Sequence, residues 1–321
     1  MTAMDGHFVC KTQASFEAVL ELMRRRSTAL QSRVIYRGQR DPNWLLQSEW
    51  ERQFLHAQRA GLLEQYYIQP HEGVKIQLQR ACLEIFRREV EQELPQERGR
   101  RDDQLWALGR HHGLMTPLLD WTIDPYKALH FALRNRTGTE PAVAVWAFHV
   151  SYMALPYSGV WDEDVFPRIA GDYASARQQA QQGVFTRLTH PIFADLEQYL
   201  LNKLPSANVS ACLVKIEVVR PSIPPLLREL RRRAINDSSL GFREESDLGR
   251  LDAIVARCNA ALRTLGKPLA WLPEPVDQEA IVVTADSQAR RLLEAIGPGK
   301  AHVTGGKVFP FLPQPTPRYI A

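Results

Sequence analysis

The residue types that most often do chemistry gather in one stretch in the first half of the sequence. Between Gly109 and Ala132 the chain carries the adjacent pair His111 and His112, then Asp120, two threonines and a tryptophan. Imidazoles transfer protons near neutral pH, and carboxylates and hydroxyls orient them or bind a ligand. Few segments that only fill a core need this mixture. We therefore expect a polar pocket on a rigid support.

A second candidate lies at the end of an expected buried strand, Val34 to Tyr36, which we predict to stop at Gly38. The planar fork of Arg37 suits a phosphate or carboxylate. The glycine after it lets a ligand or another backbone approach closely. Taken alone, the tripeptide is more typical of an arginine that pairs with a structural carboxylate.

The elements that must position these residues follow from hydrophobic periodicity, caps and turn residues. Helices are expected at Ser15 to Leu30, Gln77 to Glu93, Pro125 to Arg134, Arg220 to Arg233, Asp247 to Leu265 and Ser287 to Ile296, with a loop or short helix at Leu45 to Arg52. Strands are expected at Ala142 to Val150, Ala211 to Val219 and Ala280 to Val283. Helices and strands mix without regular alternation, which predicts an α+β fold of small mixed sheets surrounded by helices.

Composition narrows the class of protein. The 321 residues are 45% hydrophobic and 24% charged, as in an ordinary folded protein, and the net charge of +4 is only mildly basic. Four cysteines lie far apart in the sequence, and we find no secretory signal or membrane span. These features predict a cytoplasmic protein. No metal-ligand spacing, Gly-x-Ser-x-Gly elbow or phosphate-binding glycine loop is present, so we expect no metal site.

Three blocks in the same order resemble a known family, the FRG domain. They are Tyr36-Arg37-Gly38-Gln39 with Trp44, then Leu118 to Thr122 with Pro125 and the Ala128 to Ala132 helix, then Arg177 to Phe185. The resemblance covers roughly Phe16 to Ala256. It implies an FRG domain over residues 1–256 and a C-terminal extension, 257–321, that packs on it.

The FRG blocks in turn resemble the arrangement of ADP-ribosyltransferases. The resemblance implies an ADP-ribosyltransferase-like core that uses NAD, with Arg37, Thr122 and Gln181 at the three site positions. Arg37 would hold the diphosphate or ribose hydroxyls, Thr122 the nicotinamide ribose, and Gln181 the ribose 2′-hydroxyl. The cofactor-binding set it implies is Tyr36, Arg37, Gly38, Gln39, Asp120, Trp121 and Thr122.

The third position departs from the transferase pattern, which usually has glutamate there. Gln181 cannot ionise and so cannot act as a base. Glu279, in the tail, is an alternative source of a carboxylate, although a surface role fits it equally well. His111, as a catalytic base, and His112 with Asp120 as orienter, form the acceptor side of the site in one interpretation; in the other they only tie the loop to the next strand. Trp121 is more typical of core packing, and Trp44 is open to either role.

The sequence therefore predicts an NAD-dependent ADP-ribosyltransferase, a toxin-like or phage-defence effector that modifies nucleic acid or protein. A regulatory partner such as an antitoxin fits that class, and no membrane partner is expected. The alternative is a non-catalytic or nuclease-like RNA-binding defence module. In that case Arg37, the region of Arg87 and the arginines between Arg228 and Arg233 contact phosphates, although a solvated helix face is the commoner role of such a basic helix.

Overall fold

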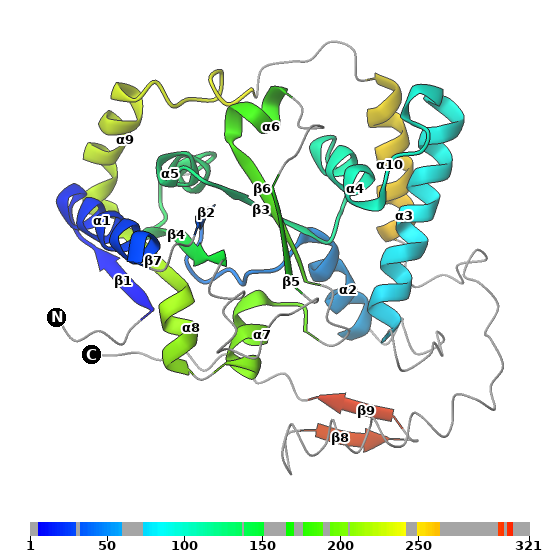
Figure 1. Ribbon diagram of the computed structural model, residues 1–321, viewed down its shortest axis with the longest axis horizontal. Helices are drawn as coiled ribbons and strands as arrows, with labels where there is room; N and C mark the ends of the chain where they lie inside the picture. Colours follow the sequence, from blue (N-terminus) through cyan, green and yellow to red (C-terminus); the bar gives the residue numbers. More distant parts are fainter. Residues whose placement is uncertain are drawn as a thin grey trace.

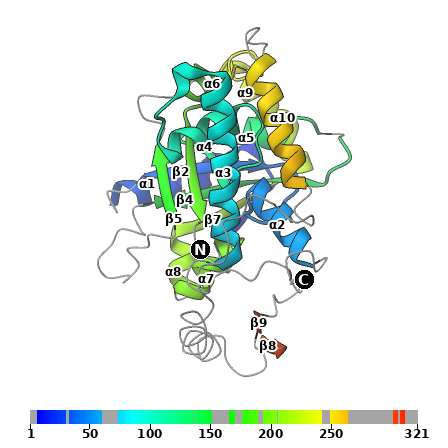
Figure 2. The ribbon, with the colours of Figure 1, turned by 90° about the vertical axis from the view of Figure 1, so that its right-hand side faces the viewer.

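The computed structural model describes residues 6–29, 33–59, 73–136, 138–150, 165–169, 176–188, 193–204, 206–241, 249–263, 301–304 and 307–310. Figures 1 and 2 show the chain in two perpendicular views. Glu279 and the expected tail elements at 280–283 and 287–296 lie outside the described residues. Among the helices described, none is long and apolar enough to cross a membrane.

A seven-stranded mixed sheet forms the centre of the described chain (Figure 1). Its order is β1 (His7–Cys10), β7 (Leu213–Val219), β4 (Ala142–His149), β2 (Val34–Gln39), β3 (Leu118–Thr122), β6 (Gly183–Leu188) and β5 (Val165–Ile169). β1 pairs with β7 in parallel, and the other neighbours are antiparallel. The prediction of an α+β fold is confirmed. The prediction of several small sheets is wrong, because strands distant in sequence join one large sheet. The described residues also form a two-stranded pair, β8 (Ala301–Thr304) and β9 (Lys307–Pro310).

The helices surround this sheet. They are α1 (Gln13–Ala29), α2 (Glu49–Arg59), α3 (Gly73–Glu93), α4 (Asp102–His111), α5 (Pro125–Leu133), α6 (Ala176–Gln181), α7 (Leu196–Lys203), α8 (Ser206–Cys212), α9 (Ile223–Arg232) and α10 (Gly249–Arg263), with short 3-10 turns at Pro95–Glu97 and Arg220–Ser222. The expected helices at α1, α3, α5, α9 and α10 are present, each with shifted ends. The segment read as a loop or short helix forms α2, which begins at Glu49 and runs to Arg59.

Apolar side chains form three clusters around the sheet. One joins α1, α5 and α9 to strands β4 and β7, through residues such as Phe16, Leu129 and Leu226. A second joins the sheet to α7 and α8 through Trp146, Phe148 and Tyr199. The third packs α2, α3, α4 and α10 together, as Figures 1 and 2 show at one side of the sheet. The four cysteines are free and buried.

Strand β2 is held close to helix α5, and this contact places Arg37. A Cβ atom added at Gly38 would lie 1.9 Å from the carbonyl oxygen of Ala128. Only a residue without a side chain therefore allows the helix backbone to approach the strand here. The expected stop at Gly38 is wrong, since the strand continues through it to Gln39.

Candidate functional site

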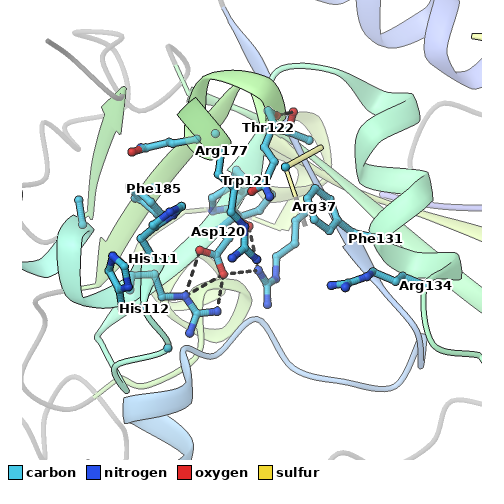
Figure 3. A pocket seen from close by; sticks show the side chains of 18 of the residues that line it. Arg37, His111, His112, Asp120, Trp121, Thr122, Phe131, Arg134, Arg177 and Phe185 are labelled. Carbon is cyan, nitrogen blue, oxygen red and sulfur yellow. Dashed lines mark hydrogen bonds and ion pairs between the residues drawn. The ribbon is translucent and has the colours of Figure 1, made fainter. Parts of the chain in front are cut away.

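A cavity of about 700 Å³ opens between the large sheet and the helical cluster. Strands β2, β3 and β6, helices α4, α5, α6 and α10, and the turn at Gly241 all contribute to its wall (Figure 3). Most of the residues expected in the site line it: Tyr36, Arg37, Gly38, His111, His112, Asp120, Trp121, Thr122 and Gln181. The volume lies in the range of pockets that bind small ligands.

Arg37 lies on β2 with its guanidinium directed toward the neighbouring strand. Its Nη1 donates to the main-chain carbonyl oxygen of Asp120 at 2.8 Å and lies 3.9 Å from the carboxylate Oδ2 of the same residue. Burial lowers the pKa of Arg37 to about 10, against the opposing effect of Asp120, so the group stays charged at neutral pH. Its Nε atom is buried and has no hydrogen-bond partner among the described residues.

The carboxylate of Asp120 is bound mainly by Arg110, from the last turn of α4. Nε of Arg110 lies 3.1 Å from both carboxylate oxygens, and Nη2 also donates to Oδ2. Burial raises the pKa of Asp120, but Arg110 and Arg37 outweigh that effect and the pKa is lowered. Arg110 also reaches Glu49 on α2 at 3.3 Å. Asp120 is therefore a fixed anion that organises the arginines around it (Figure 3).

Thr122 and Gln181 meet where α6 ends and β6 begins. The Thr122 hydroxyl donates to the main-chain oxygen of Gln181 at 2.7 Å and accepts from the amide of Asp124. The side-chain amide of Gln181 donates to the carbonyl oxygen of Leu240 at 3.0 Å. Lys127 on α5 donates to the carbonyl oxygen of Ala180 at 2.6 Å, which fixes the end of α6. Three separate segments, β3, α5 and the turn at Leu240, thus hold the end of α6 in place.

The two histidines at the end of α4 lie on one side of Asp120 in Figure 3, and Phe131 and Arg134 lie on the other. The rings of His111 and His112 meet edge to face, with centroids 5.1 Å apart. Nδ1 of His112 lies 3.2 Å from Oδ1 of Asp252 on α10. In the structure Arg110 binds both carboxylate oxygens of Asp120, so it competes with a histidine for that carboxylate.

The aromatic candidates take different roles. Trp121 is buried, its ring packs near Phe148, and its indole N–H donates to the hydroxyl of Thr186 at 2.8 Å. This contact confirms the core interpretation of Trp121. Phe131 and Phe185, which sequence reasoning did not select, line the cavity from α5 and β6. Phe131 and Phe185, and not Trp121, are therefore aromatic rings available to pack against a ligand.

Two described residues that the sequence singled out, Gln39 and Trp44, do not line the cavity. Gln39 is buried, and its side chain joins the carbonyl oxygen of Leu45 to the indole N–H of Trp146. Trp44 is 48% exposed and lies under the guanidinium of Arg40 instead. Glu279 lies outside the described residues. The structure therefore gives Gln39 a packing role within the sheet.

The cavity also holds residues that sequence reasoning missed. Arg110, Arg134, Arg177 and Asp252 all line it, so four arginines face two aspartates. Arg110 and Arg177 lie inside the sequence motifs quoted above. The only signal that could have identified them is that an arginine in such a motif is suited to bind an anion. Asp252 carries no such signal, because it comes from a separate helix 140 residues away from His112. The excess of guanidinium groups favours an anionic ligand. Among the described residues, no group of three or more His, Cys, Asp or Glu is placed to hold a metal ion.

Comparison with known proteins gives one result on the family. The model of the FRG domain matches residues 32–140, which include Arg37, the α4 histidines and the β3 motif. This match supports the resemblance to the FRG family over that segment. The block from Arg177 to Phe185 and helix α10 lie outside it. No curated protein and no solved structure matches the chain.

Proposed function

We propose that this chain, whose residues 32–140 match the FRG domain, is an NAD-dependent ADP-ribosyltransferase with an ADP-ribosyltransferase-like core. One observation carries the proposal. Arg37 from β2, Thr122 from β3 and Gln181 from α6 are far apart in sequence and line one cavity. They are the residues that the resemblance assigns to the dinucleotide.

The polar atoms left over in the cavity match the roles required of them. The buried Nε of Arg37 lacks a partner among the described residues, and a diphosphate or ribose oxygen would satisfy it. Gln181 uses its amide N–H on Leu240, which leaves its carbonyl oxygen to accept from a ribose 2′-hydroxyl. Thr122 already donates its proton to Gln181, so a ligand hydroxyl must donate to it.

The remaining lining residues suit the other parts of a dinucleotide. Arg110, Arg134 and Arg177 add positive charge near the expected diphosphate. The rings of Phe131 and Phe185 can pack against a flat base or the nicotinamide. Cleavage of the bond between nicotinamide and ribose builds positive charge on the sugar, and Asp120 provides a fixed negative charge in the same cavity.

The site differs from a transferase with a catalytic glutamate, since no glutamate is among the described residues that line the cavity. Gln181 therefore binds ribose and does not take a proton. The acceptor is proposed to be nucleic acid or protein, in keeping with a toxin-like or defence effector. The division into residues 1–256 and 257–321 also stays a proposal; α10, which spans Gly249–Arg263, runs across the expected boundary.

The RNA-binding alternative depends on other arginines. Arg87 is engaged by Asp102, and Arg232 and Arg233 are engaged by Glu229. Breaking these ion pairs to contact phosphate would offset part of the free energy of RNA binding. RNA binding is therefore measured as the alternative outcome of the experiment that follows.

The test incubates the full chain with NAD labelled with ³²P in the adenylate, together with separate pools of RNA, DNA and protein. The proposal predicts release of nicotinamide and transfer of label to one pool, both lost in Arg37→Ala. Arg87→Ala, which also removes an ion-paired arginine but lies outside the cavity, serves as the matched control and keeps both. RNA affinity that falls steeply with salt and is unaffected by NAD, with no release of nicotinamide, would overturn the proposal in favour of the binding module.

A further inference from the structure

The proposed reaction needs a group that removes the proton of the molecule that receives ADP-ribose, and the residues assigned so far do not supply it. Gln181 cannot ionise, and Arg110 holds the carboxylate of Asp120. An acceptor that attacks the ribose must nevertheless lose a proton. A general base typically speeds such a step by about 10²–10⁴-fold.

We infer that His112 is this base and that Asp252 positions it. His112 lines the cavity, its Nδ1 lies 3.2 Å from Oδ1 of Asp252, and Asp252 lines the same cavity. A carboxylate at Nδ1 fixes the tautomer with the proton on that nitrogen, which leaves Nε2 as the acceptor. No hydrogen bond to Nε2 is formed among the described residues.

Two features place negative charge beside His112. Asp252 supplies a negative charge from α10, and the carbonyl groups at the end of α4 present the negative end of the helix dipole. Other titratable groups near the ring are His111, edge to face with it, and Arg110 with its partner Asp120, which line the same cavity. The side chain of His112 is 5% exposed and that of Asp252 is 57% exposed, so the imidazole is shielded from solvent while its carboxylate partner is not.

The step balances without a further reagent, and it rests on the proposed function. The acceptor X–H attacks C1′ of the nicotinamide ribose as the bond from C1′ to the nicotinamide nitrogen breaks. The electron pair of that bond returns to the pyridinium ring, which leaves as neutral nicotinamide. The proton of X–H passes to Nε2 of His112 and then to water.

A purely structural role for the pair would be to attach α10 to the end of α4. Asn259 offers a matched control for that role. Its Oδ1 accepts from the amide of Met115 and its Nδ2 donates to the carbonyl oxygen of Gly113, both at 2.8 Å, and it does not line the cavity. Asn259→Ala therefore loosens the same attachment without removing a base.

The test measures NAD affinity and the rate of label transfer in the full chain. The rate is that of transfer to the accepting pool, or of hydrolysis to ADP-ribose where water is the acceptor. His112→Ala should leave NAD affinity within about twofold of the wild type, lower the transfer rate about 100-fold, and remove the acid side of its pH profile. Asp252→Asn keeps an oxygen for Nδ1 but loses the charge, and should lower the rate about tenfold. Asn259→Ala should keep the rate and the pH profile.

The outcomes distinguish a failure of the base assignment from a failure of the proposed function. If the wild type binds and cleaves NAD but His112→Ala keeps the rate and the pH profile, the base assignment is wrong and the proposed function stands. The assignment also fails if Asn259→Ala lowers the rate as much as His112→Ala does. If the wild type neither binds nor cleaves NAD, the proposed function fails, and the base assignment fails with it.

Discussion

Arg37 is held against the neighbouring strand by the main-chain carbonyl oxygen of Asp120, which accepts from its Nη1 at 2.8 Å. The carboxylate of the same aspartate is bound by Arg110. The guanidinium of Arg37 is thus placed by a backbone contact and is not consumed in a bidentate ion pair. This arrangement leaves part of the fork for a ligand in the cavity.

Arg110→Ala tests whether this division of contacts matters. Without Arg110, the carboxylate of Asp120 keeps Nη1 of Arg37 at 3.9 Å, and the cavity loses one positive charge. We expect NAD affinity to fall about 10–30-fold, the loss of ~1.4–2 kcal/mol of binding free energy. Isothermal titration calorimetry measures the NAD affinity of both proteins. Arg87→Ala should leave the affinity unchanged, and an equal loss in both variants would mean that general charge, not placement, sets the affinity.

Gly38→Ala tests the contact between β2 and α5. The added Cβ would meet the Ala128 carbonyl oxygen at 1.9 Å and the Ala132 amide nitrogen at 2.6 Å, both backbone atoms that cannot move aside alone. We expect the free energy of unfolding to fall by about 3 kcal/mol or more, as for a severe overpacking. Urea unfolding followed by circular dichroism measures it. At Gly249 a Cβ meets nothing within 4 Å, so Gly249→Ala should stay within about 0.5 kcal/mol. Equal stability of the two variants would contradict the packing account.

Parts of this fold could be predicted from the sequence and parts could not. Pro125 at the start of an apolar run predicted α5 correctly, and the alternation in Val214 to Val218 predicted β7. Gly38 misled the prediction because a glycine inside a strand looks like a stop until the helix that packs on it is known. Helix α4 was not predicted, although it carries Arg110 and His111.

Long-range contacts account for most of what the sequence does not reveal about the site. The motif residues Arg37, Thr122 and Gln181 could be selected, and they do share one cavity. The partner of His112 could not be selected, since nothing near Asp252 in the sequence distinguishes it from other exposed helix carboxylates. Gln39 was assigned to the ligand as part of the FRG motif, and the period of two puts its side chain on the same face of β2 as that of Arg37. Its side chain is nevertheless buried and bonded to Leu45 and Trp146, contacts that the motif does not reveal.

Thr122→Val tests the junction between β3 and α6. Valine has the same shape but loses the bonds to the Gln181 carbonyl oxygen and the Asp124 amide. Since the site is buried, we expect a loss of about 1–3 kcal/mol in unfolding free energy and a loss of NAD affinity as Gln181 shifts. Thr122→Ser keeps the hydroxyl and should retain most of both. Thermal unfolding and titration distinguish them, and a valine variant with wild-type affinity would argue against a role for this junction.

Asp195 should make stability depend on pH. It caps α7 by accepting from the amide of Gln198, while its other oxygen is buried without a partner among the described residues. Burial raises its pKa to about 7. Between the usual pKa of an aspartate, about 3.9, and this value, the folded state binds more protons than the unfolded state, so stability falls as pH rises.

Asp195→Asn keeps the cap and removes the titration. Relative to the wild type, the variant should gain ~2–4 kcal/mol of unfolding free energy between pH 4 and pH 8. Urea unfolding at several pH values measures the difference. A difference that stays constant with pH, or that shrinks as pH rises, would show that this carboxyl does not retain a proton in the folded protein.

The most direct measurement is a calorimetric titration of NAD into the full chain and into Arg37→Ala, with thermal unfolding to check that both are folded. The account predicts saturable binding of one NAD per chain, weakened about 30-fold or more in the variant, since charge-assisted bonds to a diphosphate contribute ~2 kcal/mol or more. Wild-type protein that is folded and binds no NAD, or that binds it as tightly without Arg37, would contradict it.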